Sequence, residues 1–355
     1  MRRDDWRGKV QAWLASAESL LTPMVWRAPL SRSQAVGPAT DDEAPPPEVV
    51  TWLCAESGWL AALGADDRRH VLGLAAALLK RIEWVAPQSE EVAAFWRAAV
   101  AEAAHVRNAE VPSVDVVSEL LLWWVAIHIA WPLLGLDSER RVNPRAVVLY
   151  PDTFVPDHEW IDEDGIAHHD RMPHAGEAWD DGPMVLSVAD VWDDPSVIVH
   201  EMAHVLDGAN GAVNGFPPLA PGQDPKRWTA VFSQAYDDLV RRVEIEQTAL
   251  DDQPACCEGF TGDRADDAYR DKPVRDDRFF GSGRPDDGRS HALSEATFDA
   301  YGATLPEEFF AVAVEHFFFE PARVKTPYPE VYDELRRYFR FDPERMERIH
   351  EALIA

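Results

Sequence analysis

Residues 197–206 constrain the fold of this chain more than any other stretch, because ionisable side chains stand within an apolar run. The sequence is Val-Ile-Val-His-Glu-Met-Ala-His-Val-Leu, so aliphatic residues flank His200, Glu201 and His204 on both sides. Helix-capping residues at 193–196 precede this run, which therefore predicts a buried helix. Buried charges are costly unless they are paired or bind a metal. We expect the chain to fold around a helix that carries a polar site.

The spacing of these residues is typical of a zinc site. His200 and His204 are four residues apart, so on a helix both imidazoles lie on one face and can bind one metal ion, with Glu201 beside them. Zinc lowers the pKa of water and polarises a carbonyl, while a carboxylate takes a proton from the water and passes it to the leaving amine. Composition alone produces His-Glu-x-x-His in roughly one chain in thirty of this length. The apolar context favours a zinc-dependent peptidase over two ordinary histidines.

A catalytic zinc takes a third protein ligand, for which the sequence offers alternatives. The metzincin pattern is excluded, because it needs Gly and His where this chain has Asp207 and Asn210. A helix predicted at residues 306–319 is apolar except for a few acids, and Glu308 and Glu315 share one of its faces. One of them can bind the metal while the other orients a histidine.

Two further acids near this helix are weaker candidates. Residues 297–302 resemble a Gly-Thr-x-Asp-x-x-Tyr-Gly motif that supplies an Asp ligand in another zincin group, but the spacing from Asp299 to Tyr301 is one residue short. Asp299 is therefore expected to cap a turn. Glu307 is interpreted as a first-turn residue that the helix dipole favours.

The remaining pattern predicts an α+β fold that is predominantly helical, with a small sheet beside the active-site helix. Residues 1–47 are expected to be a helical extension, formed by residues 1 to about 30, and a Pro-rich linker; residues 48–355 are expected to be one catalytic domain. Within it we expect a helical half at 48–140, a metal-site core at 145–220 and 297–345, and an acidic insertion at about 251–289. Strands are expected at 146–150 and 184–187, a hairpin around 160–166, and helices at 69–82, 89–105, 225–248, 306–319, 329–338 and 344–353.

Charge and cysteine usage exclude several classes of function. The formal net charge is −29, with 63 acidic and 34 basic residues, so nucleic-acid and anionic-membrane binding are not expected. The uncharged stretch at 120–136 is shorter than the roughly 20 residues of a membrane span and predicts a core helix. The charged start of the chain does not resemble a signal peptide, and its three cysteines do not suit a disulfide framework. A reducing, cytoplasmic setting is expected.

Two other groups could suggest metal binding. The Asp-rich segment at 251–289 lacks the spacing of a calcium-binding loop and is interpreted as a solvated acidic loop. His168, His169 and His174 lie among Asp and Pro on the predicted hairpin and are interpreted as surface residues.

Several sequence blocks together resemble the Mlc titration factor A family of glucose-regulated metallopeptidases, which are gluzincins related to the lethal-factor type. The clear similarity covers residues 145–220 and 297–345. The blocks that carry it are residues 148–151 with 154–155, 176–179 with 182–187, 199–207 and 301–312.

The resemblance implies a zincin-like fold and assigns roles to individual residues. It implies that one zinc ion is bound by His200, His204 and Glu308, with Glu201 as the general base. Tyr301, seven residues before Glu308, would donate to the oxyanion of the tetrahedral intermediate, as in the lethal-factor type.

The resemblance also suggests supporting residues and two possible functions. Glu315 is then expected to orient a histidine. Asp207 is expected to orient a histidine or the helix end, or to be an ordinary polar residue. The first function is peptidase activity on a peptide or protein substrate. The alternative is a regulatory binding protein that sequesters a transcriptional repressor, as the family's namesake does.

Overall fold

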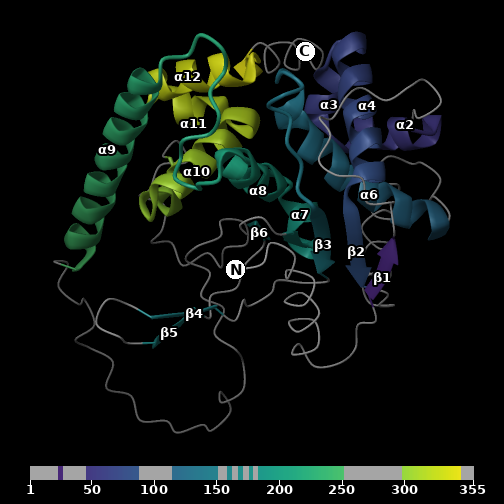
Figure 1. Cartoon of the computed structure of the whole chain (residues 1–355), viewed down its shortest axis with the longest axis horizontal. Helices are drawn as coiled ribbons and strands as arrows, with labels where there is room; N and C mark the ends of the chain where they lie inside the picture. Colours follow the sequence, from purple (N-terminus) through teal and green to yellow (C-terminus); the bar gives the residue numbers. More distant parts are fainter. Residues whose placement is uncertain are drawn as a thin grey trace, which may run out of the picture.

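The structure is a computed structural model that describes residues 23–26, 45–87, 114–150, 158–161, 167–170, 176–178, 183–251 and 298–344. Helices predominate in this part of the chain (Figure 1). The helices and short 3-10 turns are α2 (Pro47–Glu56), α3 (Gly58–Ala62), α4 (Ala65–Arg81), α6 (Val114–Ala130), η2 (Trp131–Leu133), α7 (Val188–Asp193), α8 (Ser196–Asp207), η3 (Gly208–Asn210), α9 (Pro225–Asp251), η4 (Ala300–Ala303), α10 (Pro306–Phe319), α11 (Pro321–Lys325) and α12 (Pro329–Phe339). The strands are β1 (Pro23–Trp26), β2 (Glu83–Pro87), β3 (Ala146–Tyr150), β4 (His158–Ile161), β5 (Ala167–Asp170), β6 (Gly176–Ala178) and β7 (Met184–Ser187).

The strands form one five-stranded sheet, in the order β1-β2-β3-β7-β6, and a separate two-stranded hairpin of β4 and β5. The inner strands β2, β3 and β7 are parallel, while the edge strands β1 and β6 run antiparallel to their neighbours. Strand β7 is fully buried, which explains its continuous apolar sequence. The predicted α+β, predominantly helical fold is confirmed, and the hairpin and the strands at 146–150 and 184–187 lie where they were expected.

The sequence-based prediction was wrong at two strands. Residues 23–26 form β1, although they were assigned to the N-terminal helical extension, and residues 83–87 form β2 within the half that was expected to be helical. Both segments are short and contain Pro, which disfavours a helix interior, together with Val and Trp, which favour strands. Their pairing with each other and with β3 provides the backbone partners that local periodicity does not reveal.

The predicted helices at 225–248, 306–319 and 329–338 correspond to α9, α10 and α12. The predicted helix at 69–82 corresponds to most of α4. The predicted helix at 89–105 lies outside the described residues. So do the predicted helix at 344–353, except for residue 344, and the acidic insertion at 251–289, except for residue 251.

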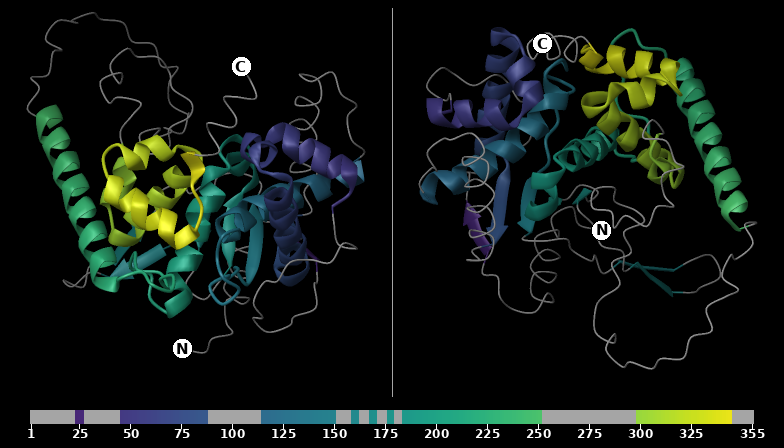
Figure 2. Two further views of the ribbon diagram at one scale, coloured as in Figure 1. Left: turned by 90° about the horizontal axis from the view of Figure 1, so that it is seen from above. Right: turned by 180° about the vertical axis from the view of Figure 1, so that it is seen from behind.

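Helix α8 lies in the middle of the molecule, between two groups of helices (Figures 1 and 2). On one side are the sheet and the helices α2, α3, α4 and α6, and on the other side are α9 to α12. Helix α8 packs mainly against α10 and also against α6 and strand β6. This central position surrounds its apolar faces with core and leaves its polar face between α10 and the edge strand.

Helix α6 and η2 form the buried core element that the uncharged stretch predicted. Trp123, Trp124 and Trp131 are all at most 5% exposed, and the aliphatic residues between them are buried as well. Among the described residues no helix is long and apolar enough to cross a membrane.

His128 is the polar exception within α6, and its ring is fully hydrogen-bonded. It is 1% exposed; its Nδ1 donates to the carbonyl of Trp124 at 2.7 Å, and its Nε2 accepts from the indole N–H of Trp59 at 3.3 Å. Burial lowers the pKa of His128 to about 4, against the weaker opposing effect of the Trp124 carbonyl. Protonation of Nε2 would place two N–H groups against each other.

The pKa of His128 predicts a loss of stability in acid. The unfolded chain binds this proton near pH 6.5 and the folded chain only near pH 4, so stability is fully present above pH 6.5 and falls as the pH drops toward 4. The contribution is on the order of 3 kcal/mol. The free energy of unfolding, measured with urea across this pH range, should therefore depend more steeply on pH for the native chain than for His128→Gln. If the free energies of unfolding of the two proteins changed equally with pH, His128 could not be a buried neutral histidine.

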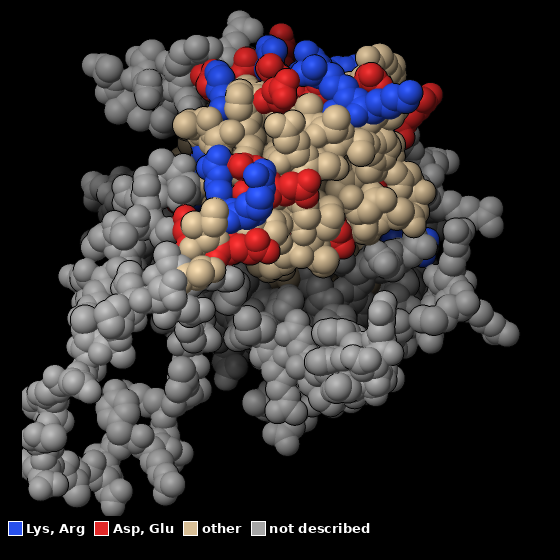
Figure 3. All heavy atoms as spheres, turned by 90° about the vertical axis from the view of Figure 1, so that its left-hand side faces the viewer, with Lys and Arg blue, Asp and Glu red and all other residues tan. Residues whose placement is uncertain are grey.

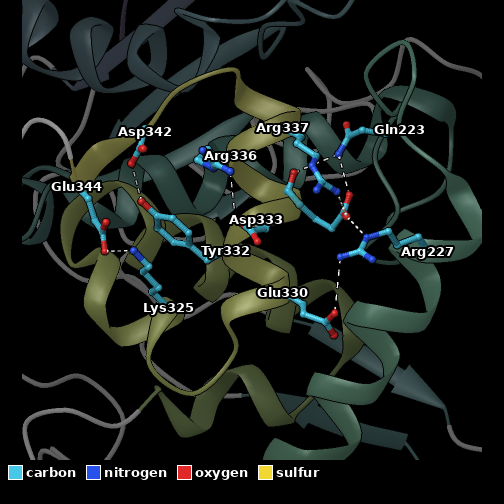
Figure 4. A network of polar contacts seen from close by, with 11 residues as sticks. Gln223, Arg227, Lys325, Glu330, Tyr332, Asp333, Arg336, Arg337, Asp342 and Glu344 are labelled. Atoms are coloured by element: carbon cyan, nitrogen blue, oxygen red, sulfur yellow. Dashed lines mark hydrogen bonds and ion pairs between the residues drawn. The ribbon is translucent and has the colours of Figure 1, made fainter.

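One carboxylate of α12 binds side chains of α9 and of the loop before it, among them Arg227 and Gln223 (Figure 4). Glu334 is 1% exposed and accepts from Arg227 at 2.6 Å, from Arg337 at 2.8 Å and from Gln223 at 3.2 Å. Gln223 also accepts the backbone N–H of Ala220 at 3.0 Å. A buried charge with this many partners is stabilised in place, so the network holds α9 and α12 together beside α10.

The surface over the α9 and α12 side carries charges of both signs (Figure 3). On α9, Asp238 pairs with Arg242 at 2.7 Å and with Arg241 at 3.6 Å. Among the residues that the structure describes on this face, acidic side chains therefore stand beside basic ones.

Candidate metal centre

Helix α8 positions its polar residues through an amphipathic sequence and a fixed N-terminus. The Asp194 carboxylate accepts the backbone N–H of Ser196 at 3.0 Å, which satisfies one of the free donors at the start of the helix. Ile198, Val199 and Met202 face the core and are fully buried. The remaining face presents the two histidines, whose side chains are each 12% exposed.

Helix α10 positions the acids opposite this face. It begins with Pro306, whose missing N–H costs nothing at a helix start, and its aromatic and aliphatic residues are buried. Glu308 lies in the first turn and Glu315 two turns later, and both side chains contact α8. The prediction that the two acids share a face toward the metal-site helix agrees with these contacts.

His200, His204 and Glu308 converge on one point. The Oε2 atom of Glu308 lies 3.2 Å from His200 Nε2 and 3.3 Å from His204 Nε2. One ligand atom from each residue lies within 4.8 Å of the others, and this is the one group of this kind that the described residues contain. In a tetrahedral site with bonds of about 2.0 Å, neighbouring ligand atoms are about 3.3 Å apart. The three residues therefore fit a metal ion in both donor type and spacing.

Glu315 lies behind His200 rather than beside Glu308. Its Oε2 accepts from His200 Nδ1 at 3.2 Å, and its Oε1 accepts from the hydroxyl of Ser196 at 3.0 Å. A carboxylate at Nδ1 holds that proton and leaves the lone pair of Nε2 pointing toward the metal position. Ser196, which the sequence suggested only as a capping residue, also holds Glu315 in place.

The electrostatics of the centre favour a cation. Burial lowers the pKa of His200, but its hydrogen bonds to Glu308 and Glu315 and the nearby charge of Glu201 outweigh burial, so the pKa lies well above its usual value. Burial raises the pKa of Glu308, but hydrogen bonds to His200 and His204 outweigh it and hold the pKa well below its usual range. Three carboxylates thus lie around the histidine pair, and the two positive charges of a divalent cation would offset most of their negative charge.

Glu201 and Tyr301 lie next to these ligands. Glu201 follows His200 on α8 and is 5% exposed. Tyr301 lies in η4, and its ring centre is 6.0 Å from that of His200. Asp299 accepts the backbone N–H of Tyr301 at 2.8 Å and caps η4, as predicted, and it is not part of the convergent group. Glu307 lies in the first turn of α10, also as predicted.

Asp207 acts on the end of α8. It is fully buried, and its Oδ2 accepts the backbone N–H groups of Asn214 and Gly215 at 2.7 and 2.6 Å. Gly215 has a φ of +75°, and a Cβ there would lie 2.7 Å from the carbonyl oxygen of Pro306. Through this loop Asp207 connects the end of the histidine helix to the start of the helix that carries Glu308.

Comparisons with known proteins match this chain to a family. The profile of the family described as glucose-regulated metallo-peptidase M90 matches residues 105–255 and 285–340, which is more than half of the chain. The gap between the two matched ranges falls within the segment predicted to be an acidic insertion.

Curated relatives carry the name Mlc titration factor A. The protein of Serratia proteamaculans is 28% identical over 232 residues, which cover 63% of this chain and 71% of the relative. That of Yersinia enterocolitica is 28% identical over 234 residues, covering 64% and 70%. That of Escherichia coli K12 is 27% identical over 233 residues, covering 64% and 70%.

Proposed function

Because this chain belongs to the glucose-regulated metallo-peptidase M90 family, we propose that it is a zinc-dependent peptidase with a zincin-like catalytic domain. The observation that carries the proposal is the convergence of His200, His204 and Glu308, with Glu201 on the same helix. The family supports metallopeptidase activity, while zinc and the residue roles are our assignments. Two imidazoles and one carboxylate are a common ligand set of catalytic zinc, which keeps a further position for water or substrate.

A bound zinc ion supplies a Lewis acid for the substrate carbonyl and lowers the pKa of water. Glu201 accepts a proton from the attacking water on its carboxylate and returns it to the nitrogen of the leaving amine. Once the water oxygen has bonded to the carbonyl carbon, the C–N bond breaks, and the products are a carboxylate and a protonated amine, which together contain all atoms of the water. Glu315 keeps the proton on His200 Nδ1 throughout. The hydroxyl of Tyr301 donates a hydrogen bond to the oxyanion of the tetrahedral intermediate.

The position of β6 supports an extended peptide as the substrate. This strand forms one edge of the five-stranded sheet and packs against α8. An edge strand offers backbone N–H and C=O groups to which an extended peptide can bind. We propose that a peptide or an unstructured protein segment lies along β6 with its scissile bond next to Glu201.

The name of the relatives favours a second function. They are called Mlc titration factor A, and we propose as the alternative that this chain binds a transcriptional repressor protein, with the metal site secondary. The net charge of −29 favours a protein partner over direct binding to nucleic acid or to an anionic membrane.

Removal of the metal tests the peptidase proposal. The purified chain should contain about one equivalent of zinc, as three ligands around one position imply. Ortho-phenanthroline should abolish cleavage of an unstructured reporter peptide, and added zinc should restore it. Meta-phenanthroline, which has the same rings but does not chelate, is the control. Cleavage that persists after complete removal of the metal would refute the proposal.

A further inference from the structure

Gly176 in strand β6 lies directly against the side chain of Glu201. A Cβ atom built on Gly176 would lie 2.8 Å from both Cγ and Oε1 of Glu201, and 2.9 Å from Cγ1 of Val197. Val197 and Glu201 are four residues apart and so face the strand from the same side of α8. The space that a side chain at position 176 would need is thus occupied mainly by Glu201.

Backbone conformation does not explain this glycine. The glycines with positive φ in the described part of the chain are Gly211, Gly215 and Gly222, and Gly176 is not among them. Any residue can adopt its backbone conformation, and its partner in the neighbouring strand is an ordinary Leu186. Glycine inside a strand weakens it and is typical of a point where another group approaches closely. Here the approaching group is the carboxylate that we assign as the base.

Glu201 has little freedom to move away. It is 5% exposed, and its helix is packed against α10 and α6 on its other sides. A carboxylate displaced by an added methyl group would have to rotate toward the metal position or force the strand away from the helix. Either movement changes the distance between the base and the bond to be cleaved.

We propose that Gly176 is a positioning residue for Glu201, because its lack of a side chain leaves the space in which the Glu201 carboxylate is held next to the edge strand. The inference rests on the proposed peptidase function for its kinetic consequence. The placement of the carboxylate itself does not depend on that function.

The test is Gly176→Ala in the full-length, zinc-loaded protein. A misplacement of about 1 Å costs on the order of a hundredfold in rate, so we expect kcat to fall roughly 10- to 100-fold. Zinc affinity and thermal stability should stay close to those of the native chain, since the three ligands are untouched. Gly64→Ala is the matched control, because a Cβ there meets nothing within 4 Å, and its kinetics should be unchanged.

A double-mutant cycle separates positioning from general packing. Glu201→Ala removes both Glu201 atoms that the added Cβ would meet, Cγ and Oε1, so Gly176→Ala should reduce the residual activity of the Glu201→Ala background much less than it reduces the activity of the native chain. An equal fold-loss in both backgrounds would overturn the proposal, as would a fully active Gly176→Ala or one that has lost its zinc.

Crystal structures of the native chain and of Gly176→Ala provide a readout that does not require activity. The Glu201 carboxylate should be displaced while His200 and His204 remain in place. An unmoved carboxylate would refute the inference even if the chain were no peptidase. Absence of cleavage by the native chain, together with a displaced carboxylate in the variant, would refute the proposed function alone.

Discussion

Glu201→Gln is expected to lower kcat for peptide hydrolysis by about 10²- to 10⁴-fold while the metal remains bound, because an amide of the same size cannot accept a proton from water. The substitution conserves volume at a side chain that is 5% exposed, so the fold should be kept. The measurements are single-substrate kinetics and metal content on the same preparation. KM should change much less than kcat, since the lost interaction is with the transferred proton.

Glu307→Gln is the matched control for this variant. Glu307 is an acid in the first turn of α10, next to Glu308, but outside the convergent group. The Glu307→Gln protein should retain full activity. A Glu201→Gln protein that cleaves at the native rate would show that the proton acceptor is another group.

The same variant distinguishes the two proposed functions. If binding of a repressor protein is the main role, Glu201→Gln should capture that partner as well as the native chain does. Partner binding and catalysis would then be separate properties of one molecule.

The second large effect is a loss of zinc affinity, which should be larger for Glu308→Ala than for Glu315→Gln. Glu308→Ala removes an oxygen atom that lies 3.2 and 3.3 Å from the two Nε2 atoms, so zinc affinity should fall by more than about 100-fold and activity should be lost. Glu315→Gln removes only the carboxylate behind His200 and should lower zinc affinity by roughly 10- to 100-fold. Competition with a chelator of known affinity measures both.

The order of these two effects is the decisive result. A larger loss for Glu315→Gln than for Glu308→Ala would reverse the roles that we assign. Asp299→Asn is the control for the rival ligand. Because Asp299 accepts the backbone N–H of Tyr301, this variant should have the zinc affinity of the native chain. If Asp299→Asn lost the metal, Asp299 would be the third ligand.

Local patterns predicted the helices of the site well, and the sheet less well. The helix at 306–319 was predicted with its observed bounds, since Pro at its start and its apolar faces are signals contained within the segment. Strands β1 and β2 were missed because each is short and is stabilised by a neighbour distant in the sequence. Periodicity reports which side of a segment is buried and says nothing about which segment covers it.

The supporting residues of the site were predicted least well. Ser196 was expected only to cap a helix, and its hydrogen bond to Glu315 spans 119 residues of sequence. Gly176 belonged to a block of family resemblance, but its contact with Glu201 depends on the distance between β6 and α8. No local signal distinguishes a glycine needed for such a contact from one in an ordinary strand.

By itself the sequence determined that His200 and His204 share a helix face with Glu201 beside them, because a spacing of four residues is a property of the helix alone. It also limited the third ligand to a few acids, without distinguishing Glu308 from Glu315 on local grounds. Only the tertiary structure decided that Glu308 lies opposite both Nε2 atoms and that Glu315 lies behind His200. The reason is that the offset between α8 and α10 is set by core packing and by the loop that Asp207 holds, and these join residues that are far apart in the chain.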